Sequence, residues 1–175
     1  MSQYNAEFLF PGHGPLIQGK DTIKEILLNT SNCLLWIEEN VLKLMNQGST
    51  LRNIQDKITL PEEFNQPYLV SSYDDFSFLI NSVWRQYGGW YSGIPSELKP
   101  PSLFDMGSAY IDMAGGKENL LLFLQSLLAE NKYKEASVLI DSISAVEPVF
   151  YRDIKNEIYS FLADHESSLM AKGIY

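Results

Sequence analysis

Apolar residues recur at spacings of three, four and seven between positions 21 and 48, and this pattern predicts one long amphipathic helix. Gly48, after two polar residues, marks its end. A polar patch at positions 29–32 is the place where this helix would bend. Seven-residue spacing along one side suits a second helix packed alongside, either within the chain or across a dimer axis. The residues of this predicted seam are Leu34, Ile37, Val41 and Leu44.

Further helical patterns follow, and their predicted limits are 51–58, 76–87, 104–113, 117–130, 133–145 and about 149–171. Thr50 has the side chain of an N-cap for the first of these helices, and Asp74 or Asp75 for the second. Pro148 fits the first turn of the last one, where its missing N–H has no helical partner to lose. The Gly- and Pro-rich segment 88–101 reads as an ordered turn or a linker.

Positions 7–10 form a short apolar run that Pro11 and Gly12 interrupt, which predicts a buried strand entering a loop. No later segment alternates in the way that demands a sheet. The predicted fold class is therefore mainly α, with a short β-strand at its front.

Composition and charge narrow the classes of protein. With 175 residues, 45% of them hydrophobic, the chain can bury a core as one domain, or as one domain plus a fragment. Its net charge of −9 would repel phosphate backbones, so we expect no nucleic-acid partner. No apolar run reaches the roughly 20 residues that span a bilayer, and positions 1–8 lack the basic start of a signal peptide. We expect a cytoplasmic protein. The single cysteine, Cys33, has no partner for an internal disulfide, which is compatible with a reducing compartment.

Two catalytic patterns are weak on chemical grounds. Residues 14–21, "GPLIQGKD", come near a phosphate-binding loop, but Pro15 donates no N–H and Asp21 would repel a phosphate. Cys33 lies in a helical pattern where a buried thiol is ordinary, and Ser92 lacks the glycine that precedes the serine of a nucleophile elbow. We interpret both side chains as structural.

His13 stands between two glycines that would let a metal approach the backbone, and a neutral imidazole is a common zinc ligand. A catalytic zinc needs at least three protein ligands, however, and the only other histidine, His165, lies in a charged stretch. From the residues alone, His13 is either a metal ligand or a hydrogen-bonded residue of a turn, and both roles remain open.

A family resemblance rests on several segments taken together. The stretch "FLFPGHGPLIQG" resembles the closing strand and loop of a metallo-β-lactamase-fold domain. The rest is similar to the helical dimerisation domain of the alkyl sulfatase group, through "TLPEEF", "SYDDFSFLINSVWRQYGGWYSGIPSELKP", "DMAGG", "AENKYKEASVLIDSISAVEP" and "SLMAKGIY". The resemblance implies a remnant of the lactamase fold at residues 1–20 and a helical dimerisation domain at 21–175, with a tetratricopeptide-like helix hairpin.

The same resemblance implies a function for a longer parent protein. It makes His13 the last ligand of a two-metal zinc site whose other ligands would come from an upstream lactamase-type catalytic domain. The parent protein would be a homodimeric hydrolase of esters or sulfate esters. This chain has no H-x-H-x-D-H motif, so we expect it to lack a complete active site by itself. An aromatic group with one cation would either cover the metal cleft or form an ordinary core: Tyr73, Trp84, Arg85, Tyr87, Trp90 and Tyr91.

A rival interpretation is a non-enzymatic adaptor built from tetratricopeptide-like repeats. Residues 127–148, "LLAENKYKEASVLIDSISAVEP", have the look of one such hairpin, with the small Ala136 at the helix crossing. A solenoid needs about three repeats at a fixed period, and the Gly-rich segment upstream interrupts the register. We therefore expect the hairpin to be one component of a helical domain.

Overall fold

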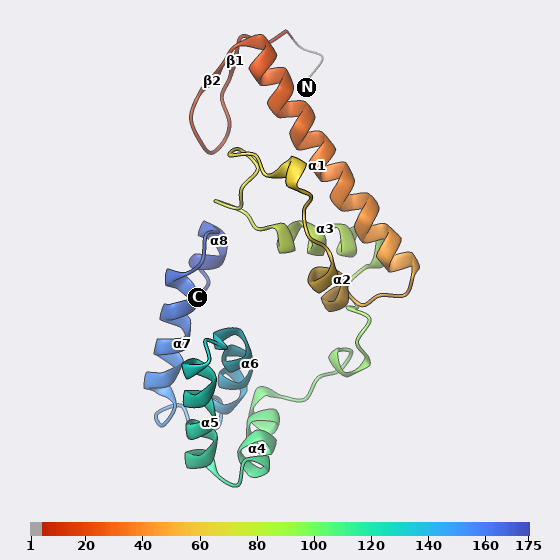
Figure 1. Cartoon of the computed structure of the whole chain (residues 1–175). Coiled ribbons are helices and arrows are strands. Elements are labelled where there is room, and N and C mark those ends of the chain that lie inside the picture. The colour runs from red at the N-terminus through yellow and green to blue at the C-terminus, as the bar shows by residue number, and fades with distance from the viewer. Residues whose placement is uncertain (1–4) are drawn as a thin grey trace. The chain divides into compact units, whose positions relative to one another are not determined.

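The computed structural model describes residues 5–175 (Figure 1). The prediction for positions 1–8 falls in part on positions 1–4, which lie outside the described residues. The described part contains eight α-helices, two short 3₁₀ helices and one small antiparallel sheet. The mainly α fold class is thus confirmed. The chain divides into two compact units, a first unit that ends at Leu98 and a second unit that begins at Lys99.

A two-stranded hairpin opens the first unit. β1 (Phe8–Leu9) pairs antiparallel with β2 (Ile17–Gln18), and Leu9 lies opposite Ile17. The predicted strand is confirmed by β1, but the prediction that it is buried is wrong, since Phe8 is 49% exposed and the hairpin has no second layer of sheet over it within the described residues. β2 was not predicted, because two residues are too few for an alternating pattern to be visible in a sequence.

The long helix predicted from the apolar spacing is α1 (Lys20–Asn46). It continues through the polar patch at 29–32, where the Thr30 hydroxyl donates a hydrogen bond to the carbonyl of Ile26 at 2.8 Å. This hydroxyl finds its acceptor within the helix, so the polar patch does not interrupt α1. α1 supplies one wall of the first unit's core.

The other wall comes from α2 (Leu51–Lys57) and α3 (Phe76–Gly88). Both predicted N-caps are confirmed: the Thr50 side chain accepts the Asn53 N–H at 3.3 Å, and the Asp75 carboxylate accepts a backbone N–H two residues on at 2.8 Å. Two 3₁₀ turns, η1 (Glu62–Phe64) and η2 (Pro95–Glu97), lie in the proline-containing connections. The core of this unit consists of Cys33, Ile37, Val41, Ile54, Ile58, Ile80 and Trp84.

The second unit is a helical bundle. Its elements are α4 (Leu103–Met113), α5 (Lys117–Ala129), α6 (Tyr133–Ile143), α7 (Arg152–Asp164) and α8 (Leu169–Lys172). α6 contacts α4, α5 and α7, so it is the central helix. α5 and α6 are joined by only three residues and form the predicted helix hairpin, with Ala136 fully buried.

The last predicted helix, 149–171, is wrong in its extent. α7 begins at Arg152, and Pro148 lies in the turn before it. The helix ends at Asp164, and a new one begins after Ser168, whose side chain accepts the N–H of Ala171 at 3.3 Å. A serine whose oxygen caps a new helix breaks the old one, and apolar spacing alone does not reveal such a restart.

Candidate functional site

His13 lies in the loop between β1 and β2 and is exposed. Its ring stacks on that of Tyr73, with the ring centroids 4.1 Å apart and the planes 17° from parallel. Tyr73 belongs to the connection that leads into α3, sixty residues further along the chain. The fold therefore brings a predicted metal ligand together with one of the six predicted aromatic-cluster residues.

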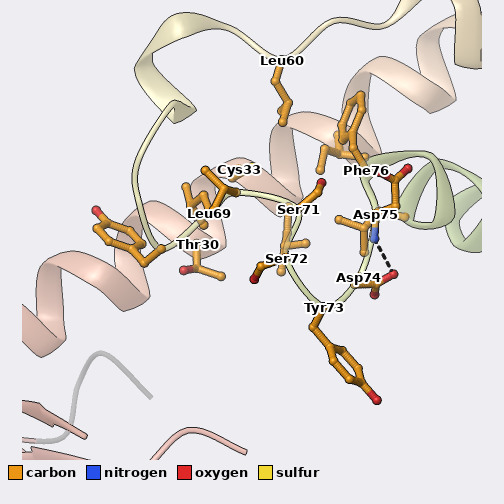
Figure 2. A pocket seen from close by; sticks show the side chains of 15 residues that line it. Thr30, Cys33, Leu60, Leu69, Ser71, Ser72, Tyr73, Asp74, Asp75 and Phe76 are labelled. Carbon is orange, nitrogen blue, oxygen red and sulfur yellow. Dashed lines mark hydrogen bonds between the residues drawn. The ribbon is translucent and has the colours of Figure 1, made fainter. Parts of the chain in front are cut away.

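Tyr73 also stands at a pocket in the first unit, with a volume of about 240 Å³. α1, the connection between α2 and α3, and α3 itself supply its walls. Figure 2 shows the Tyr73 side chain directed away from the others, while the Asp74 carboxylate accepts the N–H of Asp75 at 2.8 Å. The inner walls are apolar, with residues such as Leu60 and Leu69, and Ser72 belongs to the polar part of the lining. Such a pocket suits an apolar group with a polar end.

The two candidate nucleophiles do not have an activated environment. Cys33 is buried beside this pocket, and burial raises the pKa of its thiol, which keeps it protonated at neutral pH. The Ser92 hydroxyl donates a hydrogen bond to Glu97, whose carboxylate is also paired with Arg52 at 2.7 Å. Both side chains therefore have structural contacts. The ring of the second histidine, His165, stacks on Phe161.

The predicted aromatic cluster separates into different environments. Trp84 is buried in the first unit's core, and its indole N–H donates to the carbonyl of Tyr91 at 2.9 Å. Trp90 is 75% exposed and meets the Tyr91 ring edge-on, with 6.1 Å between centroids. The Tyr87 hydroxyl donates to Glu38 of α1, and the Arg85 side chain is exposed. The cluster thus contains both a core residue and surface residues.

The predicted seam of α1 faces two ways. Ile37 and Val41 are buried in the first unit's core, and Leu44 packs against that core. Leu34 remains half-exposed at the edge of the pocket. On the side of α1 that points away from the core, Leu28 and Leu35 are exposed and seven residues apart, and neither residue belongs to the predicted seam.

Within residues 5–175, no group of three histidine, cysteine, aspartate or glutamate side chains lies close enough to hold a metal ion. His13 alone does not satisfy the ligand requirement of zinc. The residues of this chain therefore do not fit a metal centre by themselves. In the same described range, none of the helices combines the length and the apolar character that crossing a membrane requires.

A small β-hairpin that presents a histidine comes first in the sequence, and a helical bundle with a tetratricopeptide-like hairpin comes later in it; together they define a mainly helical accessory region. The sequence profile of the alkyl sulfatase dimerisation family matches residues 50–175. The chain belongs to this family.

Its curated relatives are alkylsulfatases. A linear primary-alkylsulfatase of Pseudomonas sp. (strain ATCC 19151) is 26% identical over 121 residues, which cover 68% of this chain and 23% of the relative. An (R)-specific secondary-alkylsulfatase of Pseudomonas sp. is 26% identical over 144 residues, covering 81% of this chain and 22% of the relative. The chain thus spans less than a quarter of either relative.

A solved structure shares the fold. The stereoselective inverting sec-alkylsulfatase of Pseudomonas sp. superposes with a TM-score of 0.89 at 24% identity, over 97% of this chain and 27% of that one. At this identity the likeness establishes the fold. Together with the family match, it places the helical architecture described above in the dimerisation region of a sulfate-ester hydrolase family.

The exposed apolar side of α5 was not predicted from the sequence. Leu122 and Phe123 of α5 are exposed, whereas the leucines on the other side of this helix form the second unit's core. The signal was available, because no charged residue occurs between Glu118 and Glu130. A surface helix normally carries charge on its outer face, so an uncharged run of eleven residues indicates a helix that is covered on both sides.

Proposed function

We propose that this chain is the dimerisation and scaffolding region of a metal-dependent hydrolase of the metallo-β-lactamase type, acting on an ester or a sulfate ester. The observation that carries the proposal is the family match over residues 50–175, together with relatives that are alkylsulfatases. In this proposal residues 1–20 are the C-terminal end of the catalytic domain. Residues 21–175 hold two such catalytic domains together in a homodimer.

The β-hairpin supports the presence of an upstream domain. A sheet of two strands is marginally stable in water unless more strands or a helix cover it, and α1 covers this one only in part, since Phe8 remains 49% exposed. Phe10 is 77% exposed beside β1, and Leu16 is about half exposed beside β2. Apolar side chains at a two-stranded sheet are what remains visible when the rest of a larger sheet is supplied by other residues.

The outer face of α1 supports the same arrangement. Leu28 and Leu35 are exposed there, and α1 precedes residues 50–175, the region that the family profile matches. We assign this face to contact with the catalytic domain. The hairpin is the proposed end of that domain, it is joined to α1 at Gly19, and it packs on α1. In this proposal the hairpin and α1 are continuous in structure, and the domain limit at residue 20 separates the end of the catalytic domain from the start of the dimerisation domain.

In the whole protein, His13 would be the last ligand of a two-metal zinc site, and the remaining ligands would come from the upstream domain. Tyr73 is the aromatic residue with the best support for a place at that cleft, because its ring lies against His13. Trp84 fits the alternative of an ordinary core residue. The chain alone would be inactive, since one histidine does not hold a catalytic zinc.

The test of this proposal is the mass of the chain in solution. Analytical ultracentrifugation at tens of micromolar is expected to give twice the mass of one chain, because a dimerisation domain presents a self-complementary surface. A repeat-type adaptor would instead bind a different protein and remain a monomer. A monomer across this concentration range would therefore contradict the proposed function and favour the adaptor.

A further inference from the structure

α5 is apolar on two opposite sides. Leu120, Leu124, Leu127 and Leu128 face the second unit's core. On the other side Leu122 is 64% exposed and Phe123 is 50% exposed. A helix that is apolar all round is normally buried all round, so the outer side of α5 has the composition of an interface.

The outer residues follow the spacing of a helix-packing seam. Asn119, Leu122, Ser126 and Ala129 are separated by three, four and three residues, and all of them are exposed. This spacing keeps side chains on one face of a helix and matches the a and d positions of helices that pack side by side. Ser126 and Ala129 are small, which allows a second helix to approach closely. We call these four residues, together with Phe123, the α5 seam.

The polar side chains of the α5 seam already have partners. The Asn119 amide donates to the carbonyls of Ala114 and Gly115, both at 3.2 Å. The Ser126 hydroxyl donates to the carbonyl of Phe123 at 2.7 Å. Covering a polar group is unfavourable chiefly when it loses its hydrogen bonds to water without replacement. The N–H groups of Asn119 and the hydroxyl proton of Ser126 therefore lose little when a partner excludes water, which favours a close contact at the seam.

We propose that the α5 seam is where a second copy of this chain packs, with α5 of one protomer against α5 of its partner across a two-fold axis. This inference rests on the proposed function as a dimerisation region. A second copy is the occupant that the family match indicates, because α5 lies inside residues 50–175 whereas the apolar face of α1 lies outside them. The uncharged seam also suits self-association, since a two-fold contact brings each residue near its own copy and would juxtapose like charges.

The first experiment compares charge substitutions by analytical ultracentrifugation of the 175-residue chain. Leu122→Glu places a carboxylate in the α5 seam and is expected to raise the dimer dissociation constant by roughly a hundredfold or more. Val138→Glu is the matched control, because it places the same carboxylate at a 60% exposed apolar position of α6, in the same unit but outside the α5 seam. That control is expected to leave the dissociation constant unchanged. Both positions are exposed, and circular dichroism checks that both variants are folded.

A second experiment does not depend on disrupting the contact. In a Cys33→Ala background, Ser126→Cys is treated with a short bis-maleimide, and a cross-linked dimer is expected at high yield. Val138→Cys on α6 in the same background is the control and is expected to cross-link poorly, because this exposed position lies outside the α5 seam. This measurement reports proximity of the two α5 helices directly, whatever the effect of Leu122→Glu on folding.

The outcomes separate the inference from the proposed function. A dimer that persists in Leu122→Glu, with equal cross-linking at both cysteine positions, would overturn the α5 seam and leave the dimerisation function standing. Dissociation by Leu35→Glu on α1, with no effect of Leu122→Glu, would overturn it as well and place the second copy on α1. A monomeric parent chain would overturn the function and the inference together.

Discussion

At the scale of single residues, Tyr151 is the largest side chain that the second unit buries completely. Its hydroxyl reaches the start of α5 and donates to the carbonyl of Lys117 at 3.0 Å, a contact between residues 34 apart in the sequence. Burial raises the pKa of this phenol to about 12, and the nearby carboxylates of Glu147 and Glu118 add to the shift. The neutral phenol is therefore the form that the folded chain requires.

This pKa predicts a loss of stability in alkali. Between pH 10 and pH 12 the unfolded phenol releases its proton while the folded one keeps it, so the unfolded state binds fewer protons. The free energy of unfolding then falls as pH rises through this window, and the contribution is fully present below pH 10. Urea titrations of the parent chain and of Tyr151→Phe measure the effect.

The variant is expected to be less stable by about 1 kcal/mol at pH 7, because it lacks the hydrogen bond to Lys117. Its stability should depend less steeply on pH above 10, so that the gap between the two proteins narrows as pH rises. Two curves that stay parallel up to pH 11.5 would contradict a raised pKa for Tyr151.

The residues of the candidate site were identified by type, and their surroundings were not. A glycine-flanked histidine can be read from the sequence, but its stacking on Tyr73 depends on a loop and a connection that only the fold brings together. Trp84 and Trp90 look alike in the sequence, and yet one is in the core and the other is exposed. Trp84 lies four residues after Ile80 on the same helix face, which is the periodic signal for burial, whereas Trp90 follows the glycines that end α3.

At the scale of helices, the packing of α4 against α6 depends on Gly107. A Cβ at this position would lie 2.7 Å from the carbonyl carbon of Ser142 and 2.8 Å from a methyl group of Val146. The first of these is backbone, which has no alternative rotamer. Gly107 therefore allows α4 to approach the central helix of the bundle more closely than any other residue would.

We expect Gly107→Ala to lower the free energy of unfolding by about 1–3 kcal/mol, the usual range for an overpacked contact. Glycine-to-alanine replacement inside a helix otherwise favours the helix by up to about 1 kcal/mol, so a net loss requires the steric clash. Gly173→Ala is the matched control in the same unit, because an added Cβ there meets its nearest atom at an ordinary 3.4 Å. Urea denaturation checks both variants, and equal stabilities would contradict the close crossing.

Helices with strong local signals were predicted well. α1 has a long apolar repeat, and α2 and α3 begin at residues whose side chains cap them. The break between α7 and α8 was missed because Ser168 and the residues around it interrupt the chain without a glycine or a proline. β2 was missed for a different reason, since its pairing with β1 comes from tertiary structure and has no local counterpart in two residues.

At the scale of the whole chain, the two compact units have separate hydrophobic cores. The first consists of residues between Cys33 and Trp84, and the second of residues between Leu120 and Leu162. A domain with its own core is expected to unfold as its own cooperative unit. In the proposed function, the first unit would adjoin the catalytic domain and the second would carry the α5 seam.

Hydrogen exchange followed by mass spectrometry tests this division with one core truncation in each unit. Leu124→Ala and Ile54→Ala both remove side chains that are fully buried, so each is expected to lower the stability of its own unit by about 2–5 kcal/mol. Leu124→Ala should reduce the protection of amides in α4 to α7 and leave those of α1 to α3 unchanged, because the lost contacts belong to the second core alone. Ile54→Ala should give the reverse pattern. If either variant lowered protection equally in both units, the chain would unfold as one cooperative structure, and the helices of the α5 seam would then depend for their stability on the first unit, which in the proposed function adjoins the catalytic domain.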